Sequence, residues 1–507
     1  MRQISRQLFE HWNKAGIRYC HWKSNEHLSE GMCGLTDLDV YVFPDDRVLA
    51  ESALQELRYL KVVPQKSARY SMVDEWIGFD YDTGKLIHVH LHYQIITGTK
   101  YNKEYVFPLD NLVIQSRVQD ESTKAYLISP NLEIIILYAR IALKASDKRS
   151  ISPDSMYKRE IRFLKERIDE SVLREYCGEF FGEMGSVFFD MLLRDSLSSQ
   201  AWYRLYLMVD EWLSPSRKYP KLIVRIRYRY FRLVALRNAV GNKYLHWHIP
   251  VRKTMPNKGL SVCFLGADGS GKSTVSQEIA KWLNWKIEAS RFYLGSGEHY
   301  NSIVKRLVSK VAGYKAKKKK YPADNGIFES QEKPKEQQTV AKQGLKIRML
   351  RWGYAVLQSV YLMEIAVHSY REIKKANRYI RHGAVALYDR FPQNQFANLY
   401  DGPKIKARFF QNRRCGFAFR LMAWIEEQAI SRAQRLQPNV IFKLHLPPEE
   451  SIRRKPDHTL EEVAPKAELT SKLVFEKSRV YDIDATQEYT AEVLAIKRIL
   501  WNEMIGK

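Results

Sequence analysis

The sequence predicts an α/β protein built from more than one domain. A chain of 507 residues, 45% of them apolar, is long enough for about two to four domains that each bury a core. Residues 260–265 form a short apolar run typical of a buried strand, and residues 274–283 repeat their apolar positions with helical spacing. Residues 36–43 alternate apolar and polar side chains, as a half-buried strand does. Strand and helix patterns therefore occur in both halves of the chain.

Composition narrows the compartment and the partners. The five cysteines are scattered without disulfide or metal-binding spacing, which indicates a reducing compartment. Charges interrupt the N-terminus too early for a signal peptide, and no stretch approaches the roughly 18 apolar residues of a membrane span. We therefore expect a cytoplasmic protein, either free or peripheral to a membrane. Its net charge of +25 suits partners that carry phosphate, namely nucleotides, nucleic acid or anionic lipid.

Residues 1–150 are expected to form an α+β domain. The alternation of residues 36–43 places Asp37 and Asp39 on one face of a strand, where two carboxylates repel each other unless they share a cation. Residues 131–144 show the apolar spacing of an amphipathic helix, which we expect to pack on the sheet.

A second predicted strand, at residues 86–92, carries three histidines. His88, His90 and His92 alternate with apolar residues, so they share one face of the strand. Imidazoles beside the two aspartates are suited to Zn²⁺ or another transition metal. The interpretation we favour is a row of half-exposed histidines on a polar face.

The stretches Tyr19-Cys-His-Trp-Lys-Ser-Asn and Gly34-Leu-Thr-Asp-Leu-Asp resemble the nucleotidyltransferase-like domain that precedes thymidylate-kinase-like domains in bacterial surface-polysaccharide loci. The resemblance implies a phosphate turn at Ser24 and Mg²⁺ on the two aspartates. The chain departs from the family where Lys23 replaces a glycine and where His90 stands in place of a third carboxylate. We expect a degenerate or differently metallated domain that recognises an acceptor or supports the rest of the chain; an active transferase is the alternative.

Residues 151–255 are expected to form a helical, basic connector. From Trp212 to Ala267 there are twelve Lys and Arg and no Asp or Glu. Its middle, Lys221–Arg237, lacks Pro and Gly and predicts a helix. Such a helix is suited to lie on an anionic membrane or on nucleic acid, or to be a solvated link between domains, which is the interpretation we favour.

The third expected domain, residues 256–507, begins with a glycine-rich loop. Gly266-Ala-Asp-Gly-Ser-Gly-Lys-Ser273 matches G-x4-G-K-[ST] between a predicted strand and a predicted helix, the context this phosphate-binding motif requires. Glycines let backbone N–H groups close around a polyphosphate, while Lys272 offers a point charge and Ser273 a hydroxyl for Mg²⁺. The ATP-binding residues are predicted to be Gly266, Ala267, Asp268, Gly269, Ser270, Gly271, Lys272, Ser273 and Thr274.

The loop triplet Asp268-Gly-Ser and the segment Ala384-Val-Ala-Leu-Tyr-Asp-Arg-Phe391 resemble the thymidylate kinases and their relatives. The resemblance implies a five-stranded parallel sheet in the order 2-3-1-4-5 with helices on both faces. It also implies that Asp389 serves the metal and the attacking group, that Arg390 clamps the acceptor, and that Arg453 and Arg454 belong to a lid over the donor phosphates. With Lys272, these four residues form the predicted catalytic set. Residues 315–343 are expected to be a mobile insertion in this domain.

The acceptor is the least determined part of the predicted kinase. Arg291-Phe-Tyr-Leu-Gly-Ser-Gly-Glu298 departs from the family segment that contacts base and monophosphate. We expect ATP and Mg²⁺ as cofactors, with a dTMP-like nucleoside monophosphate or a sugar or glycan end as acceptor. Two alternatives stay open: transfer of a nucleotidyl group by the N-terminal aspartate pair, and a nucleotide-gated protein whose basic connector binds nucleic acid or membrane.

Overall fold

The computed structural model describes residues 3–145, 155–245, 247–294, 304, 306–308, 337–398, 401–410, 416–456 and 459–506. The chain groups into two compact units. The first comprises Met1–Asn257, Asn284–Glu288 and Lys497–Lys507, and the second comprises Lys258–Leu283 and Ala289–Ile496. Each unit contains a large β-sheet of its own.

The first unit is built on a mixed seven-stranded sheet in the order β3-β4-β5-β2-β1-β9-β8. Its strands are β1 Tyr19–His21, β2 Asp37–Val42, β3 Leu60–Val62, β4 Val73–Phe79, β5 Leu86–His92, β8 Val118–Gln119 and β9 Tyr126–Leu127, and a separate pair is formed by β6 Ile96–Thr97 and β7 Tyr105–Val106. Strand β5 lies parallel to β2 and antiparallel to β4, so it is the central strand of the three. The predicted strands at 36–43 and 86–92 are thereby confirmed as neighbours.

Helices cover both faces of this sheet. The helices of this unit are α1 Gln3–Lys14, α2 Leu28–Met32, α3 Arg47–Glu56, α4 Asp110–Gln115, α5 Pro130–Ala145, α6 Ser155–Lys165, α7 Glu170–Phe181, α8 Gly185–Leu193, α9 Ser199–Leu213 and α10 Lys221–Tyr244, of which α6 to α9 pack around α5. Along β2, Leu38 and Val40 pack into one core cluster with Leu8 of α1, whereas Tyr41 packs into another with Ile135 of α5. This alternation leaves the aspartates of β2 on the α5 face of the sheet.

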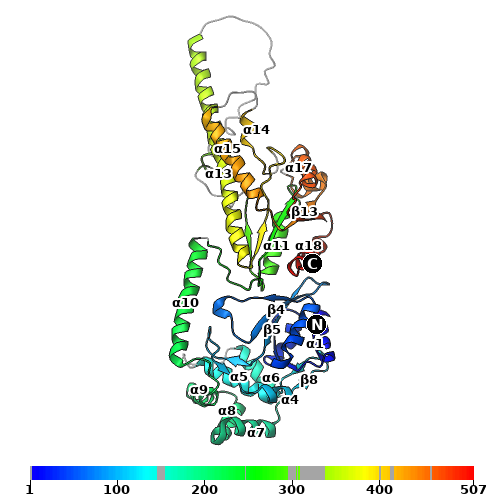
Figure 1. Cartoon of the computed structure of the whole chain (residues 1–507), viewed down its shortest axis with the longest axis vertical. Coiled ribbons are helices and arrows are strands. Elements are labelled where there is room, and N and C mark those ends of the chain that lie inside the picture. Colours follow the sequence, from blue (N-terminus) through cyan, green and yellow to red (C-terminus); the bar gives the residue numbers. More distant parts are fainter. Residues whose placement is uncertain are drawn as a thin grey trace. The chain divides into compact units, whose positions relative to one another are not determined.

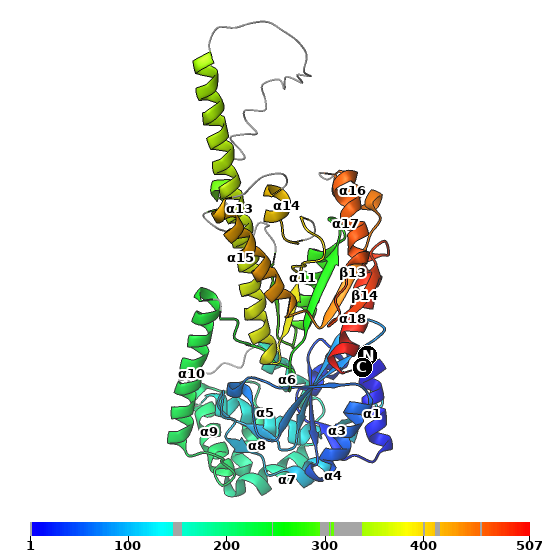
Figure 2. The same ribbon diagram turned by 45° about the horizontal axis from the view of Figure 1, so that its top comes forward.

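The second unit has a five-stranded, all-parallel sheet in the order β11-β12-β10-β13-β14. Its elements are β10 Ser261–Gly266, β11 Ala289–Phe292, β12 Val385–Tyr388, β13 Val440–His445, β14 Arg479–Asp484, α11 Lys272–Leu283, α13 Gln337–Arg381, α14 Ile405–Phe409, α15 Phe417–Gln434, α16 Pro448–Arg454, α17 Leu460–Lys472 and α18 Tyr489–Met504. Numbered along this unit, the order is 2-3-1-4-5, so the predicted α/β fold and sheet order are confirmed. Helices flank the sheet on both sides (Figure 2).

Buried strand β10 feeds the glycine-rich loop at the centre of this sheet. All six of its residues are buried. Cys263 and Leu265 face a core shared with Ile373 and Tyr379 of α13, while Phe264 on the opposite face stacks on Phe442 of β13. Because both faces are covered, the strand is apolar throughout rather than alternating.

The predicted insertion at 315–343 falls largely outside the described residues. Its last part is helical, because α13 begins at Gln337 and continues without a break to Arg381. Helices α13 and α15 run side by side in both ribbon views (Figures 1 and 2).

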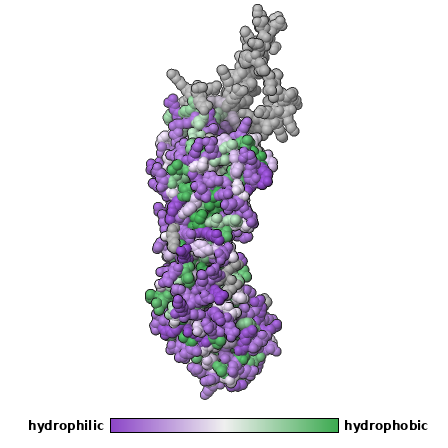
Figure 3. Space-filling view, turned by 90° about the vertical axis from the view of Figure 1, so that its right-hand side faces the viewer, coloured by the Kyte–Doolittle hydropathy of each residue, from purple (hydrophilic) through white to green (hydrophobic). Residues whose placement is uncertain are grey.

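Among the described residues, no helix combines the length and apolar character needed to cross a bilayer. One face of the molecule is mostly hydrophilic, with smaller groups of hydrophobic residues between (Figure 3).

Candidate functional sites

The glycine-rich loop joins the carboxyl end of β10 to the N-terminus of α11. Gly269 and Gly271 have φ values of 87° and 85°, in the left-handed region that favours glycine. Gly266 is needed for a different reason, because a Cβ there would lie 2.8 Å from the Leu444 carbonyl oxygen of neighbouring β13. The sequence thus fixes a tight loop whose backbone N–H groups and helix N-terminus can face an anion.

Lys272 lies folded back over this loop. Its Nζ donates hydrogen bonds to the carbonyl oxygens of Gly266, at 2.9 Å, and Ala267, at 2.7 Å. Burial and the nearby Arg390 guanidinium lower the pKa of Lys272 to about 8. The ammonium is therefore held at the loop by backbone dipoles, in a place where an anionic ligand would strengthen its charged form.

Ser273 and Asp389 meet beside the loop. The Ser273 hydroxyl donates to Asp389 Oδ2 at 2.7 Å, which joins the first turn of α11 to the residue that follows β12. Asp389 is 6% exposed, and its Oδ1 has no hydrogen-bond partner among the described residues. A buried carboxylate oxygen without a partner, next to a hydroxyl, is a donor set that Mg²⁺ fits.

A cationic cavity of about 220 Å³ opens beside Lys272 and Arg390. It is lined by Phe264, Leu265, Gly266, Asp268, Lys272, Arg390, Asn398, Asp401, Lys404, Arg408 and Lys466. Arg390 lies 3.7 Å from Asp268 and 4.0 Å from Asp401, and Lys466 of α17 forms an ion pair with Asp268. Burial alone would raise the pKa of Asp268, but the ion pair with Lys466 and the other cations lower it. Cations outnumber carboxylates in this cavity.

Three cavity cations, Lys404, Arg408 and Lys466, were not predicted from the sequence. Lys404 lies just before α14, Arg408 lies in α14, and Lys466 lies on α17. None of them belongs to a motif. The sequence contains 82 Lys and Arg, and no neighbouring pattern distinguishes these three from the others. Only the packing of α14 and α17 near the loop brings them to the cavity.

The segment predicted to act as a lid forms helix α16, and its contact with the loop differs from the expectation. Ser451 donates from its hydroxyl to the Asp268 carbonyl oxygen, and it would stand 3.0 Å from a Cβ on Gly269. Arg453 and Arg454 instead bond to Glu450 of their own helix, at 2.7 Å and 3.3 Å, and Arg454 also donates to the Ala485 carbonyl. The residue of α16 that contacts the loop is therefore Ser451, and the two arginines are engaged elsewhere.

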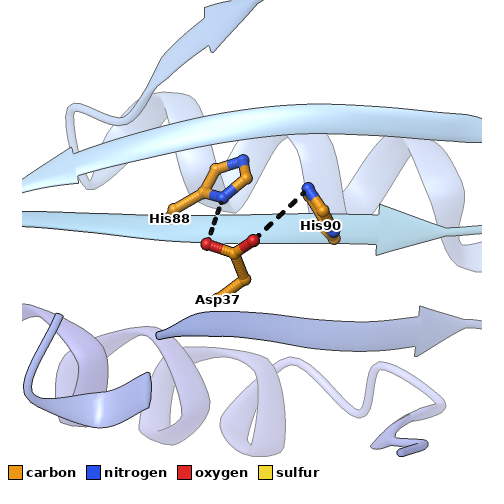
Figure 4. A group of neighbouring side chains, drawn as sticks. All are labelled: Asp37, His88 and His90. Carbon is orange, nitrogen blue, oxygen red and sulfur yellow. Dashed lines mark hydrogen bonds and ion pairs between the residues drawn. The ribbon is translucent and has the colours of Figure 1, made fainter. Parts of the chain in front are cut away.

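A second group of chemically active residues lies on the sheet of the first unit. Figure 4 shows Asp37 of β2 pointing toward His88 and His90 of β5. His88 Nδ1 lies 2.7 Å from Asp37 Oδ1, and its Nε2 lies 2.6 Å from Oε2 of Glu75 on β4. Burial alone would raise the pKa of Asp37, but His88, His90 and Lys286, whose Nζ is 2.5 Å from Asp37, hold it well below its usual value.

Asp39, His90 and His92 continue this group along the strands. His90 Nδ1 lies 3.1 Å from Asp39 Oδ1, and His90 Nε2 lies 2.9 Å from Glu75 Oε2. Burial alone would lower the pKa of His90, but Glu75 and Asp39 raise it to about 9, whereas burial lowers the pKa of His92 to about 4. Neighbouring histidines on one strand thus hold opposite protonation states at neutral pH.

Two expectations for this group are corrected by the structure. The histidines are not a half-exposed row, because His88 is 0% and His92 6% exposed. Carboxylates are also more numerous than the motif suggested, since antiparallel pairing sets Glu75 of β4 opposite His90. Lys23, which replaces the family's glycine, forms an ion pair with Asp39 at 2.8 Å, and Ser24 occupies the left-handed region with φ 56°.

Comparison with known proteins bears on part of the chain. No family model matches. The chain is 27% identical over 246 residues to YghR, an uncharacterised ATP-binding protein of Escherichia coli strain K12; the match covers 46% of this chain and 83% of YghR, and the corresponding protein of a second E. coli strain matches equally. This resemblance falls on the C-terminal half.

Two solved structures of deoxyadenosine kinase from M. mycoides, one with bound dATP and one with bound dCTP, also align. They share 12% and 14% identity with this chain, with TM-scores of 0.27 and 0.26, over 48% of this chain and 98% of the kinase. The fold of the second unit is therefore described from its own parallel sheet, in the order 2-3-1-4-5, and from the glycine-rich loop after β10. The likeness of residues 1–150 to nucleotidyltransferases stays a prediction.

Proposed function

We propose that the second unit is an ATP-dependent kinase that transfers the γ-phosphoryl group of ATP to a small acceptor. The observation that carries this proposal is the hydrogen bond of 2.7 Å from the Ser273 hydroxyl to Asp389. It lies beside the cationic cavity, which Lys272 lines. A phosphate-binding loop alone is compatible with binding or hydrolysis. A loop that shares its edge of the sheet with a carboxylate and an adjoining cavity for a second substrate supports transfer.

Each residue has a role that follows from its chemistry. The loop N–H groups and Lys272 bind the donor phosphates, and Arg390, which lines the same cavity, orients the acceptor. Ser273 and Asp389 would hold Mg²⁺, which when bound offsets the charge of the phosphate oxygens. Arg453 and Arg454 are proposed to add charge only after they leave Glu450, so their contribution requires movement of α16.

The cavity favours an acceptor that itself carries phosphate. Arg390, Lys404 and Arg408 are three cations on the side of the cavity that the loop does not form, and Asp401 offsets one of them. A neutral sugar would leave two cations without a counterion, whereas a phosphate monoester pairs with both. We therefore rank a nucleoside monophosphate or a sugar phosphate above an uncharged glycan end.

A transfer assay tests this function. Purified full-length protein is incubated with γ-labelled ATP and Mg²⁺ and with nucleoside monophosphates, sugar phosphates and free sugars in parallel. We expect label on a phosphorylated acceptor, and we expect Lys272→Ala to remove it by at least about a hundredfold without loss of folding. Turnover that is unchanged in Lys272→Ala would reject this loop as the catalytic site.

A peripheral membrane contact is a second proposal, carried by α10. One face of this helix exposes apolar side chains at helical spacing, including Leu222 at 67%, Leu233 at 65% and Tyr244 at 66%. The same exposed surface carries the basic residues Arg225, Arg229, Arg232, Arg237 and Lys243. Exposed apolar residues beside cations fit an anionic lipid surface better than a second copy of the same basic helix, which would be repelled.

Vesicle flotation tests the contact. Each basic residue near lipid contributes about 1 kcal/mol at physiological salt, so binding to phosphatidylserine vesicles should be strong at low salt and should weaken as salt rises. Replacing Leu222, Leu233 and Tyr244 by Ser should weaken it further. Binding to neutral vesicles alone, or to nucleic acid but not to vesicles, would contradict this proposal.

A further inference from the structure

The strand register of the first unit brings three metal-binding side chains together. Asp39 of β2 pairs with His90 of β5, and His92 lies two residues further along the same face. Figure 4 shows His90 directed from β5 toward Asp37, the other aspartate on this face of β2. One carboxylate oxygen from Asp39 and one ring nitrogen from each histidine lie within 4.8 Å of one another.

The hydrogen bonds among the side chains of this group do not include His92. Its side chain is 6% exposed, and neither ring nitrogen has a hydrogen-bond partner among the described residues. The ring packs edge-on against Trp22, with 5.2 Å between the ring centroids, which orients Nε2 to within 3.4 Å of Asp39 Oδ1. Nε2 thus has only a long contact with this carboxylate, and burying an imidazole that lacks a good hydrogen bond is costly, so a metal ion bound between the two atoms would offset that cost.

The spacing of Asp39 from each histidine fits a tetrahedral metal. Bonds of about 2.0 to 2.1 Å to Zn²⁺ place neighbouring ligand atoms about 3.3 Å apart. The distance from Asp39 Oδ1 is 3.1 Å to His90 Nδ1 and 3.4 Å to His92 Nε2. The other nitrogen of His90 lies 2.9 Å from Glu75 Oε2, the kind of outer carboxylate that orients a metal-bound histidine.

We propose that Asp39, His90 and His92 bind one transition-metal ion of the Zn²⁺ class, with Glu75 orienting His90. Two imidazoles and one carboxylate favour Zn²⁺ or Co²⁺ over Mg²⁺, whose preferred ligands are oxygens. His88 is not a ligand, because both of its nitrogens are already bonded to Asp37 and Glu75. Lys23 Nζ lies 2.8 Å from Asp39 Oδ1, so a metal ion bound to Asp39 would displace it.

Titration of the metal-free full-length protein with Co²⁺, and with Zn²⁺ against a chelating dye, tests the site. We expect one ion per chain, visible absorption of a tetrahedral Co²⁺ complex, and its displacement by Zn²⁺. His92→Gln and Asp39→Asn should weaken binding at least about a hundredfold, and Glu75→Gln about ten- to a hundredfold. Lys23→Met should strengthen binding, because it removes a cation that competes for Asp39.

Controls separate this site from other histidines and from misfolding. His445→Gln removes a histidine that pairs with Asp482 in the second unit, and it should leave the affinity unchanged. Thermal unfolding identifies variants that do not fold, and Lys23→Met gives a gain of binding that a misfolded protein cannot produce. Absence of a tight ion, or equal binding by His92→Gln, would overturn the assignment, as would binding that only His445→Gln removes.

Discussion

Lys272 is held at the loop with a pKa below that of an ordinary lysine. Its hydrogen bonds to two carbonyl oxygens keep it in place, while burial and Arg390 lower its pKa to about 8. An ATP polyphosphate bound at the loop would favour the ammonium and raise this pKa. The charge state of Lys272 is therefore coupled to ligand binding.

Proton uptake on ATP binding follows from this coupling. At pH values between about 8 and the pKa of the bound state, Lys272 is mostly neutral without ATP and charged with it, so affinity should fall as pH rises through 8. Calorimetry at pH 8.5 in buffers of different ionisation enthalpy measures the uptake, which we expect to be roughly three quarters of a proton for a pKa of about 8. Lys272→Arg stays charged at all these pH values and should bind ATP without that uptake. Equal uptake in both proteins would assign the proton to another group.

Lys466 separates a cavity role from a surface role on the same helix. It pairs with Asp268 in the cavity, whereas Lys472 of α17 pairs with Glu468 at the surface, 56% exposed. We expect Lys466→Met to lower kcat/KM for the transfer reaction about ten- to a hundredfold, because the cavity loses a cation that anionic substrates would meet. Lys472→Met should change it less than about twofold. Similar losses in steady-state assays of both variants would contradict a cavity role for Lys466.

Residues in motifs were predictable and residues brought in by packing were not. The loop pattern predicted Lys272 and Ser273, and the family resemblance implied Asp389 and Arg390 at the end of an apolar run. Glu75 carries no such signal, since its place beside His90 depends on the antiparallel pairing of β4 with β5. Histidine burial was misjudged for a related reason: alternation assigns a face, but only the packing of Trp22 and α5 decides whether that face is covered.

At the scale of elements, close backbone approach decides which glycines are required. Gly259 precedes β10, and its N–H donates to the Ile380 carbonyl oxygen at 2.7 Å. A Cβ there would lie 1.8 Å from the Ala384 carbonyl oxygen, a backbone atom that cannot move without displacing β12. Gly353 of α13 has nothing within 4 Å of the same position.

These two glycines predict opposite effects of the same substitution. Gly259→Ala should destabilise the second unit by about 2 kcal/mol or more, because β10 and β12 must separate. Gly353→Ala should stabilise it by about 0.5 to 1 kcal/mol, because alanine is the better helix former in open space. Denaturant unfolding of the full chain, followed through the transition that ATP shifts, measures both. A loss of stability in Gly353→Ala would show that α13 has a partner at that position.

Element order was the most predictable level of the fold. Strand β10, the loop and helix α11 follow from periodicity and turn chemistry, and the order 2-3-1-4-5 was expected from the family resemblance and is confirmed. Helix ends were less predictable: the basic helix expected at 221–237 continues to Tyr244, because neither Gly241 nor the polar residues after Arg237 interrupt it. A larger residue than Gly241 would not fit there, because the Trp247 ring lies where a Cβ would stand.

At the scale of the whole molecule, two sheets carry two different kinds of chemistry. The first unit gathers carboxylates, imidazoles and Lys23 on one face of a mixed sheet. The second places a phosphate loop, a carboxylate and a cationic cavity at one edge of a parallel sheet. If the second unit is the kinase that we propose, the first unit either supports it without taking part in transfer or contributes its aspartates to the reaction.

The double variant Asp37→Asn and Asp39→Asn separates these possibilities. Removing both carboxylates leaves Lys23 and Lys286 without their ion-pair partners, so the first unit should lose about 3 kcal/mol of stability. Phosphoryl transfer should nevertheless stay within about threefold of the unchanged protein at temperatures below unfolding, because Lys272, Ser273 and Asp389 are untouched.

Circular dichroism checks that the variant is folded under the assay conditions. Lys272→Ala is the control variant, in which the loop of the second unit is inactivated instead. If the folded double variant forms no phosphorylated product while it still hydrolyses ATP, the aspartates of β2 are part of the transfer reaction, and the first unit is a catalytic partner rather than a support.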